Sequence, residues 1–221
     1  IRMRLFVFAS LLLAFATAGS SPVHAQEALK VLVVGELESA TPVAVGPFAF
    51  EGAGLPPETD VADVIRNDLA RSGQFRTLGK NDIVEFPARG ADGKFGTWRM
   101  LKQDFLLIGR SVPSGDGYRV EYELFDVVKQ ERLLRFAMTA PAGAMRDVAH
   151  QISDAVYEKI LGVPGAFCTR IAYVTASGLG RSTRYALVVA DADGYNPRTV
   201  VNSTEPLLSP SWSPRGRRLA Y

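Results

Sequence analysis

Histidine and cysteine are scarce in this sequence, which limits the chemistry that it can support. The 221 residues include one cysteine, Cys168, and two histidines. A single cysteine cannot form an internal disulfide, and we expect Cys168 to be a buried small apolar side chain. The other candidate ligand, His150, falls on an expected helix, where we place it at the helix surface or at an interface. Because zinc needs three or four protein ligands, the sequence predicts no metal site, and we expect no cofactor.

An excess of charge of one sign is also missing. The chain has 25 lysines and arginines and 23 aspartates and glutamates. The first 25 residues contain Arg2 and Arg4 but no acidic residue, so the remainder has 23 charges of each sign and no net charge. Nucleic-acid binding needs a concentrated basic face. We therefore expect no nucleic-acid partner.

No apolar run is long enough to cross a membrane comfortably. Residues 5–15 form the main one, and a bilayer needs about 20 apolar residues in a helix. The run follows Arg2 and Arg4 and leads through small residues to Val23-His24-Ala25, which is the pattern of a secretory signal peptide. We expect residues 1–25 to be cleaved after Ala25, with an uncleaved N-terminal anchor as the alternative.

Motifs that carry catalysis or phosphate binding are missing as well. No G-x-S-x-G occurs, and residues 90–94 fail the spacing of a P-loop. The stretch at residues 178–182 leads into no clear helix and is expected to be a polar loop. Residues 191–194 resemble the start of a calcium loop but lack the later ligands, so they indicate a hairpin turn. We predict no catalytic residues and no enzyme activity.

Hydrophobic periodicity predicts an α/β domain over residues 26–165. Polar and apolar residues alternate over residues 118–124, as in a half-buried strand. Two longer stretches have the spacing of an amphipathic helix. In chain order the predicted elements are an extended segment at 26–37, a strand at 42–50, a helix at 58–72, a strand at 74–78, one helical turn at 82–86, a short helix at 97–103, strands at 104–110, 118–124 and 133–139, and a helix at 144–161. Their order favours one mixed sheet covered by two main helices.

A change of pattern at residue 166 predicts a second, all-β part over residues 166–221. Short strands are expected at residues 171–175, 185–190 and 197–202, with turn residues between them. Four strands of this length make about one blade of a β-propeller.

The strongest local motif is the stretch SPSWSPRGRRLAY at residues 209–221. It resembles the blade repeat of TolB-type propellers, which reads approximately S-P-x-W-S-P-D-G-x-x-L-A-Y. In such a repeat Trp212 packs between sheets, residues 214–216 form a tight turn, and residues 219–221 start the next strand. Arg215 stands where the family usually has aspartate, which can bond its own backbone in the turn.

Three further stretches resemble the same family. Residues 153–159 are similar to the last helix of its N-terminal domain, residues 165–174 to its interdomain junction, and residues 191–196 to the hairpin turn of its first blade. The resemblance implies an α/β N-terminal domain followed by the first blade of an incomplete β-propeller, because the family has six blades. We expect a truncated reading frame or a fragment that lacks most of the propeller.

The resemblance to the TolB family implies a non-enzymatic, periplasmic component of the Tol–Pal system. Such a protein links TolA to Pal, supports outer-membrane integrity and constriction at cell division, and is peripheral to the membrane through its partners. In the family the propeller binds Pal and the segment after the signal peptide contacts TolA. The alternative is the N-terminal fragment of a secreted, propeller-bearing serine peptidase, because such propellers carry similar repeats.

The resemblance places TolA binding on residues 26–37. An extended strand of apolar residues can add to the edge of a partner's sheet. On the alternative interpretation, this segment is an edge strand of the chain's own sheet. The arginines 215, 217 and 218 form a basic cluster, which is either a solvated turn or a contact for an acidic partner. The residues that we expect to contact TolA are Leu29, Val31, Val33 and Leu37.

Overall fold

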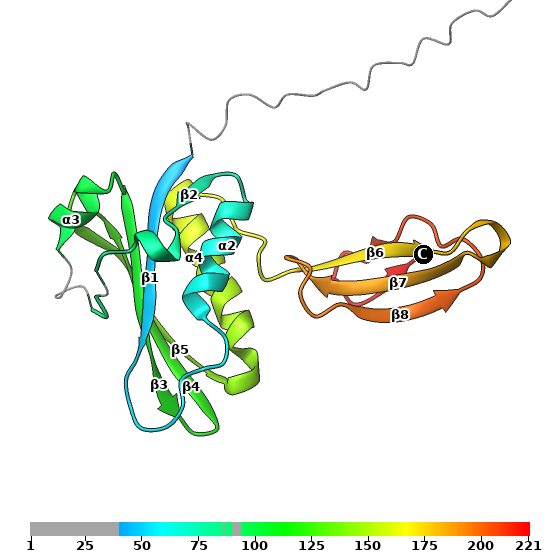
Figure 1. Ribbon diagram of the computed structural model, residues 1–221, viewed down its shortest axis with the longest axis horizontal. Coiled ribbons are helices and arrows are strands. Elements are labelled where there is room, and N and C mark those ends of the chain that lie inside the picture. Colours follow the sequence, from blue (N-terminus) through cyan, green and yellow to red (C-terminus); the bar gives the residue numbers. More distant parts are fainter. Residues whose placement is uncertain (1–39, 86, 90–93) are drawn as a thin grey trace, which may run out of the picture. The chain divides into compact units, whose positions relative to one another are not determined.

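A five-stranded mixed sheet forms the first part of the chain in the computed structural model, which describes residues 40–85, 87–89 and 94–221 (Figure 1). The strand order is β2-β1-β3-β4-β5. Strand β1 runs parallel to β2 and β3, whereas β4 is antiparallel to β3 and β5. The elements are β1 (Thr41–Phe50), α2 (Val61–Arg71), β2 (Phe75–Thr77), α3 (Phe95–Met100), β3 (Phe105–Ser114), β4 (Gly117–Asp126), β5 (Glu131–Pro141) and α4 (Met145–Leu161).

Helices α2 and α4 pack side by side on one face of this sheet (Figure 1). The side chain of Asp60 caps α2 by accepting a hydrogen bond from the backbone N–H of Asp63 at 3.1 Å. Helix α4 ends at Gly162, whose positive φ of 74° closes the helix in a left-handed conformation that favours glycine. Within the described residues, the expected order of elements and the two main helices are confirmed.

The core lies between the sheet and these two helices. Along β4, the buried side chains of Val120, Tyr122 and Leu124 face the helices, as the alternating pattern predicts. A smaller apolar cluster covers part of the opposite face of the sheet, where Trp98 of α3 is fully buried against Leu106 and Ile108 of β3, among others. The sheet therefore has one face covered by helices and one face covered only in part.

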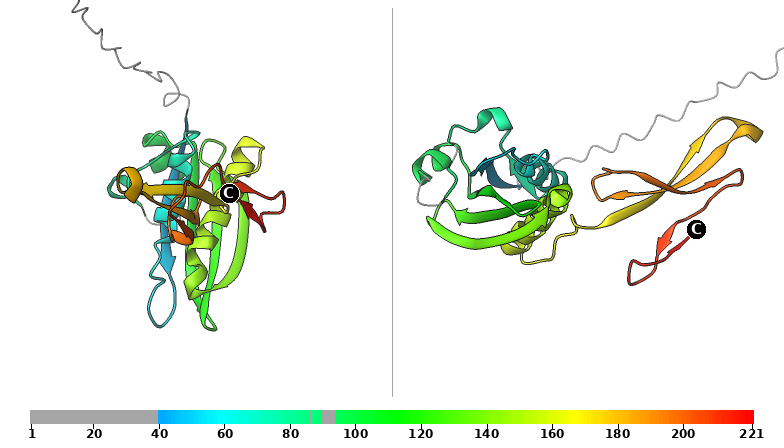
Figure 2. Two further views of the ribbon diagram at one scale, coloured as in Figure 1. Left: turned by 90° about the vertical axis from the view of Figure 1, so that its right-hand side faces the viewer. Right: turned by 90° about the horizontal axis from the view of Figure 1, so that it is seen from below.

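A three-stranded antiparallel sheet forms the second part, with the order β6-β7-β8. A separate hairpin of β9 and β10 follows it (Figure 2). The bounds are β6 (Arg170–Ser177), β7 (Arg184–Asp191), β8 (Arg198–Ser203), β9 (Ser211–Trp212) and β10 (Leu219–Ala220). The three predicted strands are confirmed, and these strands are of the propeller type that the family resemblance implies.

The repeat motif forms the β9–β10 hairpin. Its turn falls at residues 214–216, and Gly216 has a φ of 63°. Trp212 pairs with Leu219 across the hairpin and is half-buried. In the described part of the chain, β9 does not join the sheet of β6, β7 and β8.

Some boundaries differ from the prediction. The short helix α3 begins two residues earlier and ends three residues earlier than the predicted span of 97–103. The single helical turn expected at residues 82–86 is a 3-10 turn at Lys80–Asp82. Among the helices that the structure describes, none has the length and apolar character needed to cross a membrane.

Candidate functional site

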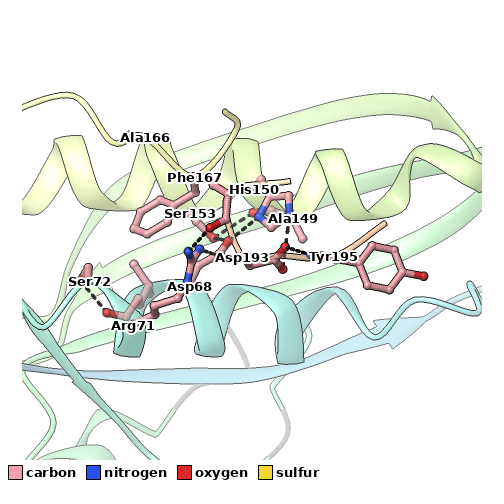
Figure 3. A network of polar contacts seen from close by, with 12 residues as sticks. Asp68, Arg71, Ser72, Ala149, His150, Ser153, Ala166, Phe167, Asp193 and Tyr195 are labelled. Carbon is pink, nitrogen blue, oxygen red and sulfur yellow. Dashed lines mark hydrogen bonds and ion pairs between the residues drawn. The ribbon is translucent and has the colours of Figure 1, made fainter. Parts of the chain in front are cut away.

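The predicted TolA contact lies outside the described residues, as do the signal peptide and the extended segment at 26–37. The residues concerned are Leu29, Val31, Val33 and Leu37. Their role therefore stays a prediction. The structure instead brings together a polar network that joins α2, α4 and the turn between β7 and β8 (Figure 3).

Asp68 is the centre of this network (Figure 3). Asp68 lies on α2 and is 1% exposed, and its carboxylate lies 2.7 Å from Nδ1 of His150. The same carboxylate accepts hydrogen bonds from the Ser153 hydroxyl at 2.9 Å and from Nη2 of Arg71 at 3.0 Å. Because buried charges are tolerated only when they are paired and hydrogen-bonded, these three donors explain how Asp68 is accommodated in the core.

The pKa of Asp68 shows the net effect of these contacts. Burial by itself raises the pKa of a carboxyl group, because it disfavours the charged form. The donors on His150, Ser153 and Arg71 stabilise the carboxylate and outweigh that effect. The pKa of Asp68 therefore lies below its ordinary value, and the network favours an ionised aspartate.

The arrangement of serine, histidine and aspartate differs from that of a hydrolase triad. In a triad the histidine lies between the serine and the aspartate, so that it can take the serine proton. Here the aspartate lies between the other two, because both His150 and Ser153 contact Asp68. Ser153 is fully buried and His150 is 2% exposed. Ser153 has neither the base nor the access to act as a nucleophile, so this cluster lends no support to the peptidase alternative.

The other side of His150 faces the turn after β7. Its Nε2 atom lies 3.9 Å from Oδ2 of Asp193, and Arg146 of α4 forms an ion pair with the same aspartate. The Arg146 guanidinium also lies 3.9 Å from the centre of the Tyr195 ring, which is the distance of a cation–π contact. The predicted hairpin turn at residues 191–194 is confirmed, and it also contributes to this contact.

A second arginine strengthens the contact from α2. Arg71 donates from Nη1 to the carbonyl of Ala192 at 2.6 Å while its Nη2 contacts Asp68. One guanidinium group thus bonds both the buried carboxylate and the backbone of the turn. The turn is held by α2 and α4 together.

Asp68, His150 and Asp193 place three potential ligand atoms within 4.8 Å of one another. A metal site of this kind needs carboxylates whose charge is available to the ion. Here each carboxylate is already paired with an arginine, Asp68 with Arg71 and Asp193 with Arg146. The donor set therefore favours an ion-pair network over a metal site.

The segment that leads from α4 to β6 is fixed by a second aspartate. The carboxylate of Asp154 accepts hydrogen bonds from the backbone N–H of Phe167 at 2.8 Å and of Cys168 at 3.1 Å. A Cβ atom at Gly165 would lie 2.4 Å from Oδ1 of Asp154, so the absence of a side chain allows this close approach. Phe167 is buried and packs edge-on against Tyr157 at a centroid distance of 5.6 Å.

One sequence prediction is wrong in this region, and a second is wrong in part. Cys168 is exposed, not buried, because the backbone bonds to Asp154 orient the segment with the neighbouring Phe167 inward. Partial loss of water and the nearby carboxylates, that of Asp154 foremost, raise the pKa of the Cys168 thiol.

His150 was expected at the helix surface or at an interface, and it is buried at the contact between α2 and α4, so only the surface position is wrong. The sequence does contain a sign that α2 needs a buried polar partner, namely the position of Asp68. Asp68 follows Val64 by four residues and Ile65 by three, so it falls on the buried stripe of α2. A charged residue on that stripe requires a buried polar partner, and His150 is that partner.

The fold defines a class of proteins in which an α/β domain is joined to strands of a β-propeller. Residues 29–133 match the family model described as the TolB amino-terminal domain. Residues 157–221 match the family model described as the TolB beta propeller domain. The chain belongs to the TolB family.

Individual relatives agree with this assignment. The chain is 61% identical over 197 residues to the Tol-Pal system protein TolB of Xanthomonas campestris pv. campestris, and equally to that of Xanthomonas oryzae pv. oryzae. The match covers 89% of this chain and 45% of each relative. The crystal structure of TolB from Acinetobacter baumannii is 34% identical, with a TM-score of 0.72 over 82% of this chain and 43% of that one. The chain thus spans about half the length of the relatives that it matches.

Proposed function

We propose that this protein is a non-enzymatic interaction component of the Tol–Pal system in the periplasm. The observation that carries the proposal is the 61% identity to relatives named Tol-Pal system protein TolB, together with the two TolB family models. In this role the protein links TolA to Pal, supports the outer membrane and cell constriction, and stays peripheral to the membrane. Its position outside the cytoplasm depends on the signal peptide at residues 1–25.

The proposed division of the chain is a signal peptide at residues 1–25, an α/β domain at 26–165 and a partial propeller of about one blade at 166–221. Helix α4 ends at Leu161 and β6 begins at Arg170, so the boundary at residue 165 falls in the connecting segment. Gly165 lies against Asp154 in that segment. Pal is the proposed partner of the propeller.

TolA is the proposed partner of the segment that precedes β1. The backbone N–H of Thr41 donates to the carbonyl of Gln74 at 2.9 Å, so the point at which that segment joins the sheet is fixed. Residues Leu29, Val31, Val33 and Leu37 are all odd-numbered, and side chains at alternate positions of a strand lie on the same side. Added to the edge of a sheet in TolA, the segment would bind through backbone hydrogen bonds and this one row of apolar side chains.

The polar network has a mechanical role in this proposal. It contains no nucleophile–base pair, and its ion pairs tie α2 and α4 to the turn that carries Asp193. A partner bound to the α/β domain and a partner bound to the propeller would then act on connected parts of one protein. No bond-making chemistry is needed for that role.

Site-specific photocrosslinking in cells tests the TolA contact. A photoreactive residue at Val33 is expected to form an adduct with the C-terminal domain of TolA. In the matched control the photoreactive residue replaces Val200 of β8, which is 57% exposed and lies outside the proposed contact. Equal adducts from both positions, or none from Val33, would refute the assignment.

A further inference from the structure

The face of the five-stranded sheet opposite α2 and α4 carries a charged surface. Trp98 covers the part near Leu106 and Ile108, and the rest of the face is polar. We call this the arginine face. It consists of five arginines and three glutamates that contact one another, namely Arg89, Arg110, Arg119, Arg132, Arg135, Glu51, Glu121 and Glu123.

Each glutamate of the arginine face is shared by two arginines. Five arginines against three glutamates leave an excess of positive charge on this face. Because the arginines outnumber the glutamates, the face is able to accept further carboxylates. The ion-pair distances are 2.7 Å for Arg89–Glu51, 3.7 Å for Arg110–Glu51, 2.5 Å for Arg110–Glu121, 3.0 Å for Arg119–Glu121, 3.8 Å for Arg132–Glu123 and 3.5 Å for Arg135–Glu123.

Two arginine side chains of this face are more exposed to solvent than the glutamate that they share. Arg135 and Arg132 are 62% and 48% exposed, whereas Glu123, which they share, is 16% exposed. The glutamate lies beneath and the guanidinium groups reach the solvent. Each of these guanidinium groups has five N–H donors and keeps some of them free for an incoming carboxylate.

Strand β5, which carries Arg132 and Arg135, is at the edge of the sheet. It pairs with β4 on one side, and among the described residues no strand pairs with its other side. Its 11 residues, Glu131–Pro141, are mostly exposed or half-buried. Such an edge presents unpaired backbone N–H and C=O groups that can pair with another strand.

The two faces of β5 differ in character. Arg135 lies opposite Glu123 on the arginine face, whereas Phe136 lies opposite Tyr122 on the other face. The Phe136 ring stacks on Tyr122 at a centroid distance of 6.1 Å and is 56% exposed. A strand added beside β5 would therefore meet cationic side chains on one face and an exposed aromatic ring on the other.

We propose that β5 docks an extended segment of a partner protein by strand addition, and that acidic side chains alternate with apolar ones in that segment. Arg132 and Arg135 lie on the same face of β5 although they are three residues apart, because the register with β4 shifts between them. Because side chains of the added strand point alternately to opposite faces, its acidic ones would reach these arginines while its apolar ones cover Phe136. A second copy of β5 is a poor occupant, because it would bring its own arginines against these two. The proposal concerns β5 and uses none of the residues that are proposed to contact TolA.

A pair of designed peptides tests the proposal on the chain from residue 26 onward. One fluorescent peptide alternates glutamate with valine, and its control alternates lysine with valine. Fluorescence anisotropy is expected to show binding of the glutamate peptide that weakens as salt is added. Amide hydrogen exchange along β5 is expected to slow in the complex, because strand addition protects edge backbone groups whereas charge attraction alone does not.

Charge reversal provides the matched control. Arg135→Glu is expected to weaken the binding of the glutamate peptide by about tenfold or more, an effect of the size found for close charge pairs across an interface. Arg181→Glu makes the same charge change in an exposed loop and is expected to leave the binding unchanged. If Arg135→Glu fails to fold, as judged by circular dichroism, Arg132→Glu takes its place.

Three results would overturn the proposal. The first is equal binding of the lysine peptide, and the second is binding of the glutamate peptide that is insensitive to Arg135→Glu or leaves the exchange of β5 unchanged. The third is slow exchange along β5 in the free protein, as in an inner strand, which would mean that a segment of the same chain or a second copy already occupies this edge.

Discussion

The Nδ1 atom of His150 lies 2.7 Å from a carboxylate oxygen of Asp68, although the two residues are 82 positions apart in the chain. Both are buried, and their contact joins α4 to α2. The opposite ring nitrogen of His150 faces Asp193 in the turn after β7. This pair therefore links the interior of the α/β domain to the polar contacts that hold that turn.

Loss of the Asp68 charge should destabilise the protein. In Asp68→Asn the buried donors of His150 and Ser153 lose their charged acceptor. Breaking one side of a buried, hydrogen-bonded ion pair costs about 3 kcal/mol in the free energy of unfolding, and urea denaturation measures it. The control, Lys80→Gln, also removes one charge, but from an ion pair with Asp60 in which both side chains are exposed, at 63% and 47%, and it should cost much less. Equal costs for the two variants would contradict the role given to Asp68.

The contribution of Asp68 should disappear in acid. Its pKa is lower in the folded protein than in the unfolded chain, so its stabilisation is present above the unfolded pKa and is lost as the pH falls through the folded pKa. The unfolded pKa of aspartate is about 3.9. The difference in free energy of unfolding between the wild type and Asp68→Asn should be full at neutral pH and shrink below about pH 4. A difference that stays constant into strong acid would contradict the ionised state of Asp68.

Removal of the Arg146 side chain should loosen the turn between β7 and β8. Arg146→Ala loses both the ion pair to Asp193 and the contact with the Tyr195 ring. Hydrogen exchange followed by mass spectrometry should show faster exchange in peptides that cover residues 191–196, with no change in the β3–β4 hairpin. Arg181→Ala, which removes an exposed arginine elsewhere, should change neither. Unchanged exchange at the turn in Arg146→Ala would show that these contacts do not hold it.

Two glycines of the α/β domain should respond in opposite ways to alanine. A Cβ atom at Gly117 would lie 2.1 Å from the Ala140 carbonyl oxygen and 2.7 Å from Cα of Pro141, both backbone atoms of β5. Gly117→Ala should therefore destabilise the protein by about 1–3 kcal/mol. Gly96 is exposed in α3 with no described atom within 4 Å of its added Cβ, so Gly96→Ala should stabilise by about 0.5–1 kcal/mol. Thermal denaturation of both variants measures the difference, and a loss of stability in both would contradict the local geometry of α3.

The main elements were predictable because local pattern and tertiary environment agree. The alternation over residues 118–124 gives β4, and the apolar stripe that begins at Met145 gives α4, which ends at Gly162 as expected. Strand β3 continues past its predicted end at Arg110 to Ser114. It does so in spite of Pro113, because β1 pairs with β3 only as far as Ser111, and the missing N–H of the proline costs no ladder bond there.

The polar network was not predictable in the same way. Sequence periodicity places Asp68 on the buried stripe of α2, but it does not identify a partner 82 residues away. Cys168 shows the same limit, because its exposure is set by backbone bonds to Asp154 and not by the apolar character of a thiol. Contacts between elements that are distant in sequence decide both positions.

A calorimetric titration of the TolA C-terminal domain into the chain from residue 26 onward tests the central claim most directly. The account predicts saturable binding that is lost when residues 26–37 are deleted, while circular dichroism shows that the described fold is intact. Val31→Asp and Val33→Asp, on the row of apolar residues, should each weaken binding, whereas Val34→Asp on the opposite side should have a smaller effect. Binding that is unchanged by the deletion, or no binding by the intact chain, would contradict the account.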